Sequence, residues 1–245
     1  MKNALSPELH AFVAEIPLVR RSILRFVRQA AEALPMGSRV LDAGAGDAPY
    51  RELFSHCDYL TTDLAATTYH DFSRRPPNIV CDLTAIPLPT ASLDAILCTE
   101  VLEHVPEPTA VLAEFRRLLM PGGQLFLTTP FFWGLHEQPY DFYRFTPYAL
   151  ERLFTQAGFA VLTIRPRDGF FTTVAMQLIF LRRLWPLPSS KSLLGRVVGR
   201  LLRMWMTGLS RWASQLDRFD NDRLVTLGYM SHCIVDSTLE RAPDG

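Results

Sequence analysis

One segment of the chain, residues 130–147, is rich in ionisable and aromatic side chains. Its centre reads His-Glu-x-Pro-x-Asp-x-x-Arg and contains His136, Asp141 and Arg144. Because the unperturbed pKa of histidine lies near neutrality, His136 is a candidate general base. Asp141 could orient its imidazole, and Arg144 could hold a phosphate or carboxylate of a substrate. Alternatively, Asp141 and Arg144 form an internal salt bridge that fixes the segment, with the aromatic residues as its small core.

A metal site is a further interpretation of the same segment. His136, Glu137 and Asp141 could offer ligands to a hard cation. Their spacing fits no helix-borne pattern such as His-Glu-x-x-His, and we therefore expect no metal.

Residues 40–46, Val-Leu-Asp-Ala-Gly-Ala-Gly, describe a nucleotide pocket made of backbone and one carboxylate. The glycines permit a tight turn and a close approach of backbone to ligand, and a helix is expected to follow. Asp63, at the end of the next apolar run, can accept hydrogen bonds from both ribose hydroxyls. Pro49 replaces the third glycine of the dinucleotide motif G-x-G-x-x-G, and Asp42 precedes the first glycine. The pattern therefore favours S-adenosylmethionine (SAM) over NAD, although a purely structural turn would show the same letters.

Five motifs between residues 39 and 164 follow one another in the order seen in a known family. They are the turn at 40–46, Asp63, residues 80–83 with 86–89, the segment 93–105 containing Glu-Val-Leu-Glu-His, and residues 118–127. In this order and spacing the chain resembles the class I SAM-dependent methyltransferases. The resemblance is strong over about half of the chain and says little about residues after 166.

The resemblance implies a set of residues that contact SAM. The backbone from Ala43 to Gly46 would face the methionine part, and Asp42 would organise that turn. The remaining contacts would be Asp63 and Leu64 at the ribose, Asp82 and Leu83 at the adenine, and Gly44, Thr99 and Glu100 where strands end at the ligand-binding edge. Structural alternatives are that Asp42 caps a helix and that Asp82 satisfies a turn.

His104 is a second candidate for the chemistry, because it follows the fourth expected strand and could reach the substrate. In the family, the Glu103-His104 pair often fixes loops instead, and this alternative stays open.

Short apolar runs alternate with helical patterns along the chain. The runs predict strands at 39–43, 59–62, 79–81, 95–98, 124–129, 160–165 and 226–236, with helices at 109–119 and 147–157 between them. This alternation predicts an α/β, Rossmann-like, seven-stranded and mostly parallel sheet with helices on both faces. By resemblance, the seventh strand runs antiparallel beside the sixth.

The expected organisation is an N-terminal helical segment, residues 1–36, followed by a methyltransferase domain over 37–245. A helical insertion over 169–220 separates strands six and seven. From Gly169 to Leu216 it contains seven basic residues, three tryptophans and no acidic residue. This composition fits helices that cover the active site, an anionic membrane surface bound through 174–212, or, least well, a nucleic acid.

Bulk properties narrow the class of protein. With 25 basic and 25 acidic side chains, no global field attracts nucleic acid. The four cysteines are scattered and lack zinc spacing, as in a reducing compartment. No apolar run reaches the roughly 18 residues of a spanning helix. We therefore expect a cytoplasmic protein and leave open a peripheral contact at the inner face of a membrane.

The sequence predicts SAM-dependent methyl transfer to a small-molecule, sugar or lipid-linked acceptor, at oxygen rather than nitrogen. Nitrogen would be favoured by an Asn/Asp-Pro-Pro-Tyr element after the fourth strand, and residues 99–104 contain none. The alternatives are a non-catalytic SAM-binding assembly or regulatory factor, and an NAD-linked oxidoreductase.

Overall fold

The computed structural model describes residues 6–15, 17–64, 76–184 and 193–236. They fall into two compact units, a larger one within residues 1–165 and 228–245 and a smaller one within 166–227.

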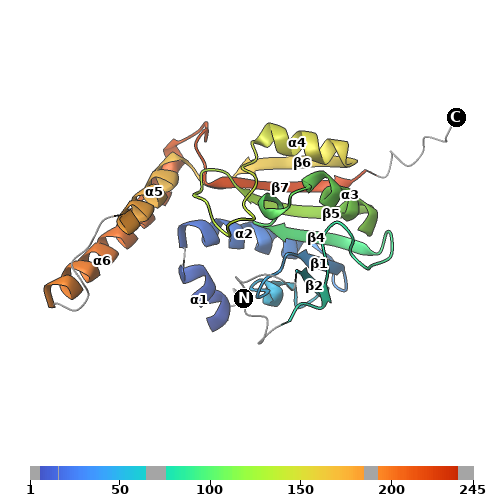
Figure 1. Ribbon diagram of the computed structural model, residues 1–245, viewed down its shortest axis with the longest axis horizontal. Coiled ribbons are helices and arrows are strands. Elements are labelled where there is room, and N and C mark those ends of the chain that lie inside the picture. The colour runs from blue at the N-terminus through green and yellow to red at the C-terminus, as the bar shows by residue number, and fades with distance from the viewer. Residues whose placement is uncertain (1–5, 16, 65–75, 185–192, 237–245) are drawn as a thin grey trace. The chain divides into compact units, whose positions relative to one another are not determined.

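The larger unit is built on one seven-stranded sheet in the order β3-β2-β1-β4-β5-β7-β6 (Figure 1). The pairs β1–β2, β2–β3, β1–β4 and β4–β5 are parallel, whereas β7 runs antiparallel to β5. The expected fold class is confirmed. The strands are β1 Arg39–Ala43, β2 Asp58–Asp63, β3 Ile79–Val80, β4 Leu93–Thr99, β5 Leu119–Pro130, β6 Phe159–Pro166 and β7 Gly228–Val235.

Helices cover both faces of this sheet, as alternating strand residues show. Phe126 of β5 meets Phe26 of α2 edge to face, with ring centroids 6.1 Å apart. Its neighbour Leu125 points the other way and joins the core that contains Phe115 of α3 and Phe154 of α4. The helices are α1 Pro7–Glu15, α2 Pro17–Ala33, α3 Pro108–Leu118 and α4 Pro147–Gln156. The N-terminal helices are therefore part of the same compact unit as the sheet.

The start of α4 shows why the local sequence forms a helix there. Thr146 is its N-cap, and the side chain accepts a hydrogen bond from the backbone N–H of Ala149 at 3.2 Å. Pro147 occupies the first turn, where its missing N–H is no loss. This rigid start holds the C-terminal end of the segment with the candidate base.

The prediction of a helix directly after the glycine turn is wrong. A single turn of 3₁₀-helix, η1 Arg51–Phe54, stands in its place. Ala48 has a φ of +48°, and Pro49 follows it, so an α-helix cannot extend back through this position. Because β2 already begins at Asp58, only one turn fits between the two.

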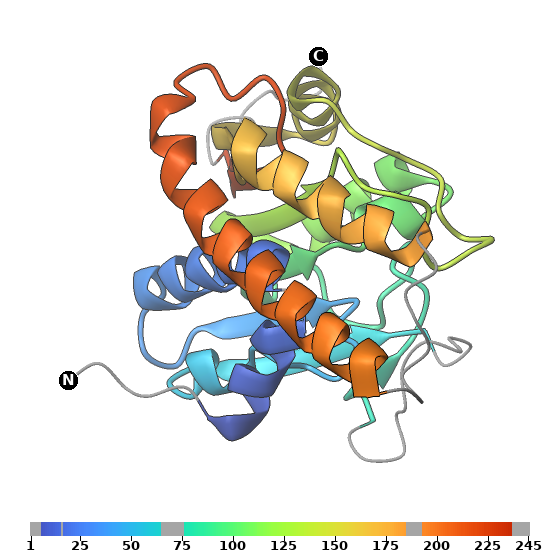
Figure 2. The same cartoon turned by 90° about the vertical axis from the view of Figure 1, so that its left-hand side faces the viewer.

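The smaller unit contains the two helices α5 Phe170–Leu184 and α6 Leu193–Leu216, followed by the short η3 Asp217–Phe219 (Figure 2). Buried Asp217 accepts hydrogen bonds from the backbone N–H groups of Gly169, Phe171 and Thr172 at 2.9–3.1 Å. A carboxylate at a helix N-terminus satisfies donors that have no partner within the helix. The residue after α6 thus fixes the start of α5, which makes the insertion a closed unit.

Candidate active site

The glycine turn after β1 is held against β2. The backbone N–H groups of Gly44 and Ala45 both donate to the carbonyl of Thr62, at 2.9 and 3.1 Å. Gly44 has a φ of +74°, and a Cβ atom there would lie 2.5 Å from Cγ2 of Val101. The turn therefore requires glycine both for its backbone conformation and for its close contact with the segment after β4.

Asp63 connects the end of β2 to the same turn. Its buried carboxylate accepts hydrogen bonds from the N–H of Gly46 and from the N–H of Leu64, each at 2.7 Å. Hydrogen bonds to a charged acceptor are about twice as strong as neutral ones. Asp63, the residue predicted to bind the ribose, thus lies beside the predicted turn, as a pocket made of backbone and one carboxylate requires.

Asp42 has a different partner from the one expected. Its side chain accepts a hydrogen bond from the hydroxyl of Tyr59 on β2 rather than from the turn. The carboxyl is buried, and this desolvation, opposed by the hydrogen bond from Tyr59 and aided by the nearby charge of Asp63, raises its pKa to about 7. Tyr59 was not predicted, because a tyrosine at the start of a strand carries no signal of its partner.

The predicted adenine contact forms a local turn. Asp82 accepts hydrogen bonds from both the N–H and the hydroxyl of Thr84, each at 2.8 Å. Leu83 is buried with Ile86 in the core below the turn. These contacts are those of a local turn, and the adenine contact of Asp82 stays a prediction.

The fourth strand ends in a strained residue at the edge where ligands bind. Thr99 is the last residue of β4, and Glu100 follows with a φ of +54°. The side chain of Glu100 accepts from the hydroxyl of Thr128 at 2.8 Å, and its N–H donates to the carbonyl of Thr128 at 3.0 Å. Non-glycine residues in this conformation concentrate at functional sites. The strain here turns the chain from β4 toward the short helix η2 Leu102–His104.

The segment after β5 is held against η2 by backbone hydrogen bonds. The carbonyl of Glu103 accepts from the N–H groups of Phe142 and Tyr143, at 2.9 and 3.3 Å. The hydroxyl of Tyr143 donates to the carbonyl of Pro106 at 2.8 Å. Two loops that are distant in sequence thereby form one wall of the site.

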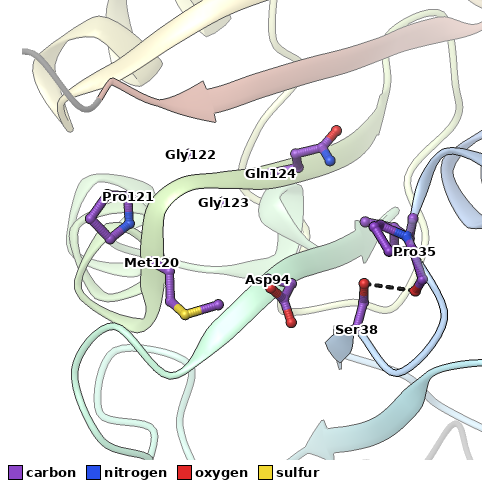
Figure 3. A pocket seen from close by; sticks show the side chains of 9 residues that line it. Pro35, Ser38, Asp94, Met120, Pro121, Gly122, Gly123 and Gln124 are labelled. Carbon is purple, nitrogen blue, oxygen red and sulfur yellow. Dashed lines mark hydrogen bonds between the residues drawn. The ribbon is translucent and has the colours of Figure 1, made fainter.

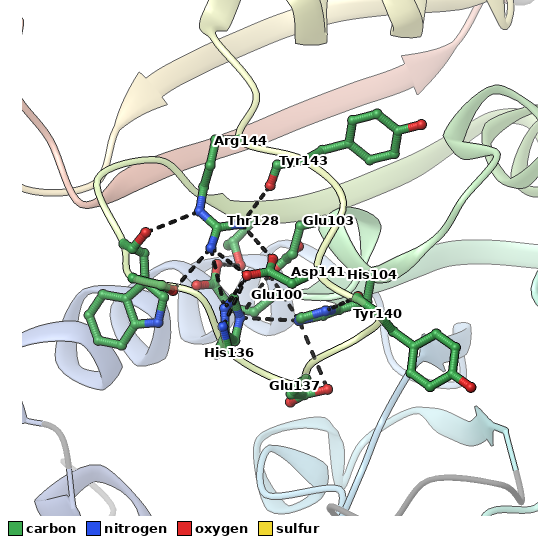
Figure 4. A network of polar contacts seen from close by, with 12 residues as sticks. Glu100, Glu103, His104, Thr128, His136, Glu137, Tyr140, Asp141, Tyr143 and Arg144 are labelled. Atoms are coloured by element: carbon green, nitrogen blue, oxygen red, sulfur yellow. Dashed lines mark hydrogen bonds and ion pairs between the residues drawn. The ribbon is translucent and has the colours of Figure 1, made fainter.

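Arg144 uses all five of its N–H donors within this wall (Figure 4). Two bind the carboxylate of Asp141 at 2.6 and 2.8 Å, and the others bind the carbonyls of Trp133, Gly134 and Tyr143 at 2.7–3.3 Å. The pairing lowers the pKa of Asp141 well below its usual range and raises that of Arg144. The geometry favours the internal salt bridge over the predicted binding of an anionic substrate group by Arg144.

His104 and His136, 32 residues apart in sequence, meet at the centre of this network (Figure 4). Their Nε2 atoms lie 3.1 Å apart. Nδ1 of His104 lies 2.7 Å from the carbonyl of Tyr140, and Nδ1 of His136 lies 3.4 Å from Oδ2 of Asp141. The Tyr140 carbonyl only accepts, so Nδ1 of His104 carries a proton. In the neutral pair, Nε2 of His136 then donates to Nε2 of His104, and Nδ1 of His136, which lies 3.4 Å from Nη2 of Arg144, is the nitrogen left to accept a proton.

The charge state of His136 follows from its surroundings. Burial, and then the proximity of His104, lower its pKa, and the carboxylate of Asp141 opposes this effect. A lowered histidine pKa means that the ring is neutral at pH 7 and able to accept a proton. The carboxylate beside Nδ1 then stabilises the imidazolium that results.

The same pair could hold a metal ion together with Glu103. Oε1 of this buried carboxylate lies 3.8 Å from Nε2 of His104 and 4.0 Å from Nε2 of His136. Within the described ranges, these three ligand atoms form a group with all distances under 4.8 Å. Two imidazoles and a carboxylate are a donor set that suits divalent transition metals. This trio differs from His136, Glu137 and Asp141, the set considered from the sequence.

A cavity of about 210 Å³ lies away from these residues, near the amino ends of the parallel strands (Figure 3). It is lined by Pro35, Ser38, Asp94 and the start of β5 around Gly123. These residues precede or begin the parallel strands, whereas the site residues follow the carboxyl ends of the strands. Ligands of open α/β sheets bind at the carboxyl ends, so we do not assign this cavity to the chemistry.

Comparison with known proteins decides the family. A family model described as a methyltransferase domain matches residues 17–164, more than half of the chain. The chain belongs to this methyltransferase family. The resemblance inferred from the five motifs is confirmed, and SAM is the cofactor of the family.

The methyltransferase also matches curated relatives over part of their length. It is 35% identical over 125 residues to a ubiquinone biosynthesis O-methyltransferase of Xanthomonas axonopodis pv. citri, a match that covers 46% of this chain and 52% of the relative. A protein of the same description from Xanthomonas oryzae pv. oryzae is 60% identical over 40 residues, 16% and 17% of the two chains. The methyltransferase thus spans about half or less of the curated relatives it matches.

Solved structures support the fold. A SAM-dependent methyltransferase from Archaeoglobus fulgidus aligns over 92% of this chain and 98% of its own, with a TM-score of 0.58 and 16% identity. The [4+2]-cyclase SpnF aligns over 88% and 82%, with a TM-score of 0.55 and 17% identity. Because a cyclase and a methyltransferase share this architecture, the fold alone does not decide the reaction.

Proposed function

We propose that this chain transfers the methyl group of SAM to a hydroxyl group of a small-molecule, sugar or lipid-linked acceptor. The observation that carries the proposal is the His104–His136 pair, in which burial lowers the pKa of His136, at the strand ends that also present the glycine turn and Asp63. The partial relatives are O-methyltransferases, which points to the same acceptor atom.

The cofactor pocket fits SAM on the evidence of its own contacts. The glycine turn allows close approach of backbone to a ligand, and Asp63 is a buried acceptor fixed beside it. When bound, SAM supplies an electrophilic methyl group. Asp63 and the backbone from Ala43 to Gly46 would hold it.

The chain's own residues have two tasks in the reaction. They must hold the acceptor oxygen in line with the methyl group and remove its proton. We assign the proton to Nδ1 of His136, where the Asp141 carboxylate 3.4 Å away stabilises the charged form, while His104 is fixed by the Tyr140 carbonyl and accepts from Nε2 of His136. Asp141 and Arg144 act as positioning residues, because they hold the segment that carries His136.

The test measures the conversion of SAM to S-adenosylhomocysteine in the presence of acceptors with phenolic or sugar hydroxyl groups. We expect His136→Asn to lower kcat by about 100-fold or more, within the usual range for loss of a general base. Affinity for S-adenosylhomocysteine, measured by calorimetry, should stay within about twofold. Asp63→Asn is the matched control, because it should weaken cofactor binding by about 1–3 kcal/mol.

The outcomes separate the alternatives. Unchanged turnover in His136→Asn would refute the assignment of the base. Cofactor binding without turnover on any acceptor would favour a non-catalytic SAM-binding factor. Loss of turnover with a chelator, restored by a divalent metal, would assign Glu103, His104 and His136 to a metal instead of a proton.

A further inference from the structure

Helix α6 carries an apolar stripe that faces solvent. Leu194, Trp205 and Trp212 are each 60–69% exposed. At 3.6 residues per turn, these positions fall with the other exposed apolar residues of α6 on an arc of about 100°. The others are Val197, Leu201 and Met204. An ordered stripe of this kind marks an interaction surface, in contrast to scattered exposed apolar residues.

A second arc of α6 carries positive charge beside the stripe. Arg196 and Arg200 are exposed and fall on the helical wheel next to the arc that holds Leu201. Ala213 is buried and falls on the remaining side of the wheel. The neighbouring helix α5 adds a shorter exposed row at the spacing i, i+4, i+8, formed by Phe170, Val174 and Leu178.

Positive and negative charge are unevenly distributed along the chain. Residues 169–216 contain seven basic and no acidic side chains. Because the whole chain has equal numbers of both, the remainder carries seven excess negative charges. An anionic surface would attract the insertion and repel the rest of the chain.

We propose that the exposed face of α6 docks on an anionic lipid surface, with the helix in the plane of the headgroups. Exposed tryptophans and leucines beside arginines have the chemistry of such interfacial helices. Within the described part of the chain, no helix is long and apolar enough to cross a bilayer. A nucleic acid would leave the apolar stripe in water. Pairing with a second copy would bring rows of arginines close together. The inference does not depend on the proposed methyl transfer.

The experiment is sedimentation of the full chain with vesicles of phosphatidylcholine alone or with one-third phosphatidylglycerol. We expect binding to the anionic vesicles that weakens with salt. A basic residue near such a surface contributes about 1 kcal/mol, or roughly fivefold in partitioning. The double substitution Arg196→Glu and Arg200→Glu should therefore weaken binding by at least about 30-fold. The double substitution Trp205→Ser and Trp212→Ser should also weaken vesicle binding. Soluble glycerol phosphate, added as a competitor, should not weaken it.

The matched control is Arg152→Glu with Arg165→Glu, an equal charge change at exposed positions of α4 and β6. It should leave vesicle binding within about threefold, and all variants should keep the parent melting temperature. Equal binding to neutral and anionic vesicles, no binding, or equal loss in the control would overturn the proposal. So would a stable dimer in analytical ultracentrifugation that the two tryptophan substitutions dissociate.

Discussion

Replacing Asp42 with asparagine should stabilise the cofactor-free protein at alkaline pH. Burial raises the pKa of Asp42 from its ordinary 3.8 to about 7, so between these values the folded state holds a proton that the unfolded state releases. Stability must then fall as pH rises from about 4 to about 7 and stay level above it. At 1.36 kcal/mol per pKa unit, the full effect is about 4 kcal/mol. Asparagine has no charge to desolvate, and its oxygen can still accept from Tyr59.

The assay is urea unfolding of the parent and of Asp42→Asn at about pH 4, 6 and 8. The free energies of unfolding of the two proteins should be nearly equal at the lowest pH, and that of the variant should be higher by about 4 kcal/mol at the highest pH. Glu151→Gln, at an exposed position of α4, is the control and should show no such divergence. A constant difference across pH, or a variant less stable than the parent at pH 8, would refute the desolvation argument.

Two further predictions concern the turn and the loop clasp. Gly44→Ala should destabilise the fold by about 2 kcal/mol or more, because it combines a positive φ with a Cβ 2.5 Å from Val101. Val101→Ala in the same chain should recover part of the loss in thermal unfolding, and no recovery would contradict the proposed clash. Asp141→Asn should lower stability by about 1.5–3 kcal/mol at pH 7, since it removes the charge from the two hydrogen bonds that Arg144 donates in this partly buried ion pair. The pKa of Asp141 is depressed well below its ordinary 3.8, so its contribution is complete above about pH 4 and is lost progressively as the pH falls toward the folded-state pKa. A parent–variant gap of equal size at about pH 5 and pH 2 would contradict this.

Much of the fold could be predicted because its signals are local. Alternating apolar runs and helical patterns located all seven strands, and Pro147 with Gly158 bounded α4, since turn and cap residues act on their own neighbours. The glycine turn and Asp63 were found for the same reason. The helix expected after the turn was wrong where Ala48 and Pro49 together required a different backbone.

What only the tertiary structure decided depends on pairs that are distant in sequence. Nothing local indicates that Tyr59 would bind Asp42, or that His104 would meet His136 across 32 residues. The use of all donors of Arg144 depends on backbone carbonyls, which have no sequence signal. The composition of the insertion indicated basic, tryptophan-rich helices, but which arc of α6 stays exposed was set by packing within the insertion. Sequence determines local backbone preference, whereas burial and long-range contact fix protonation, orientation and chemical role.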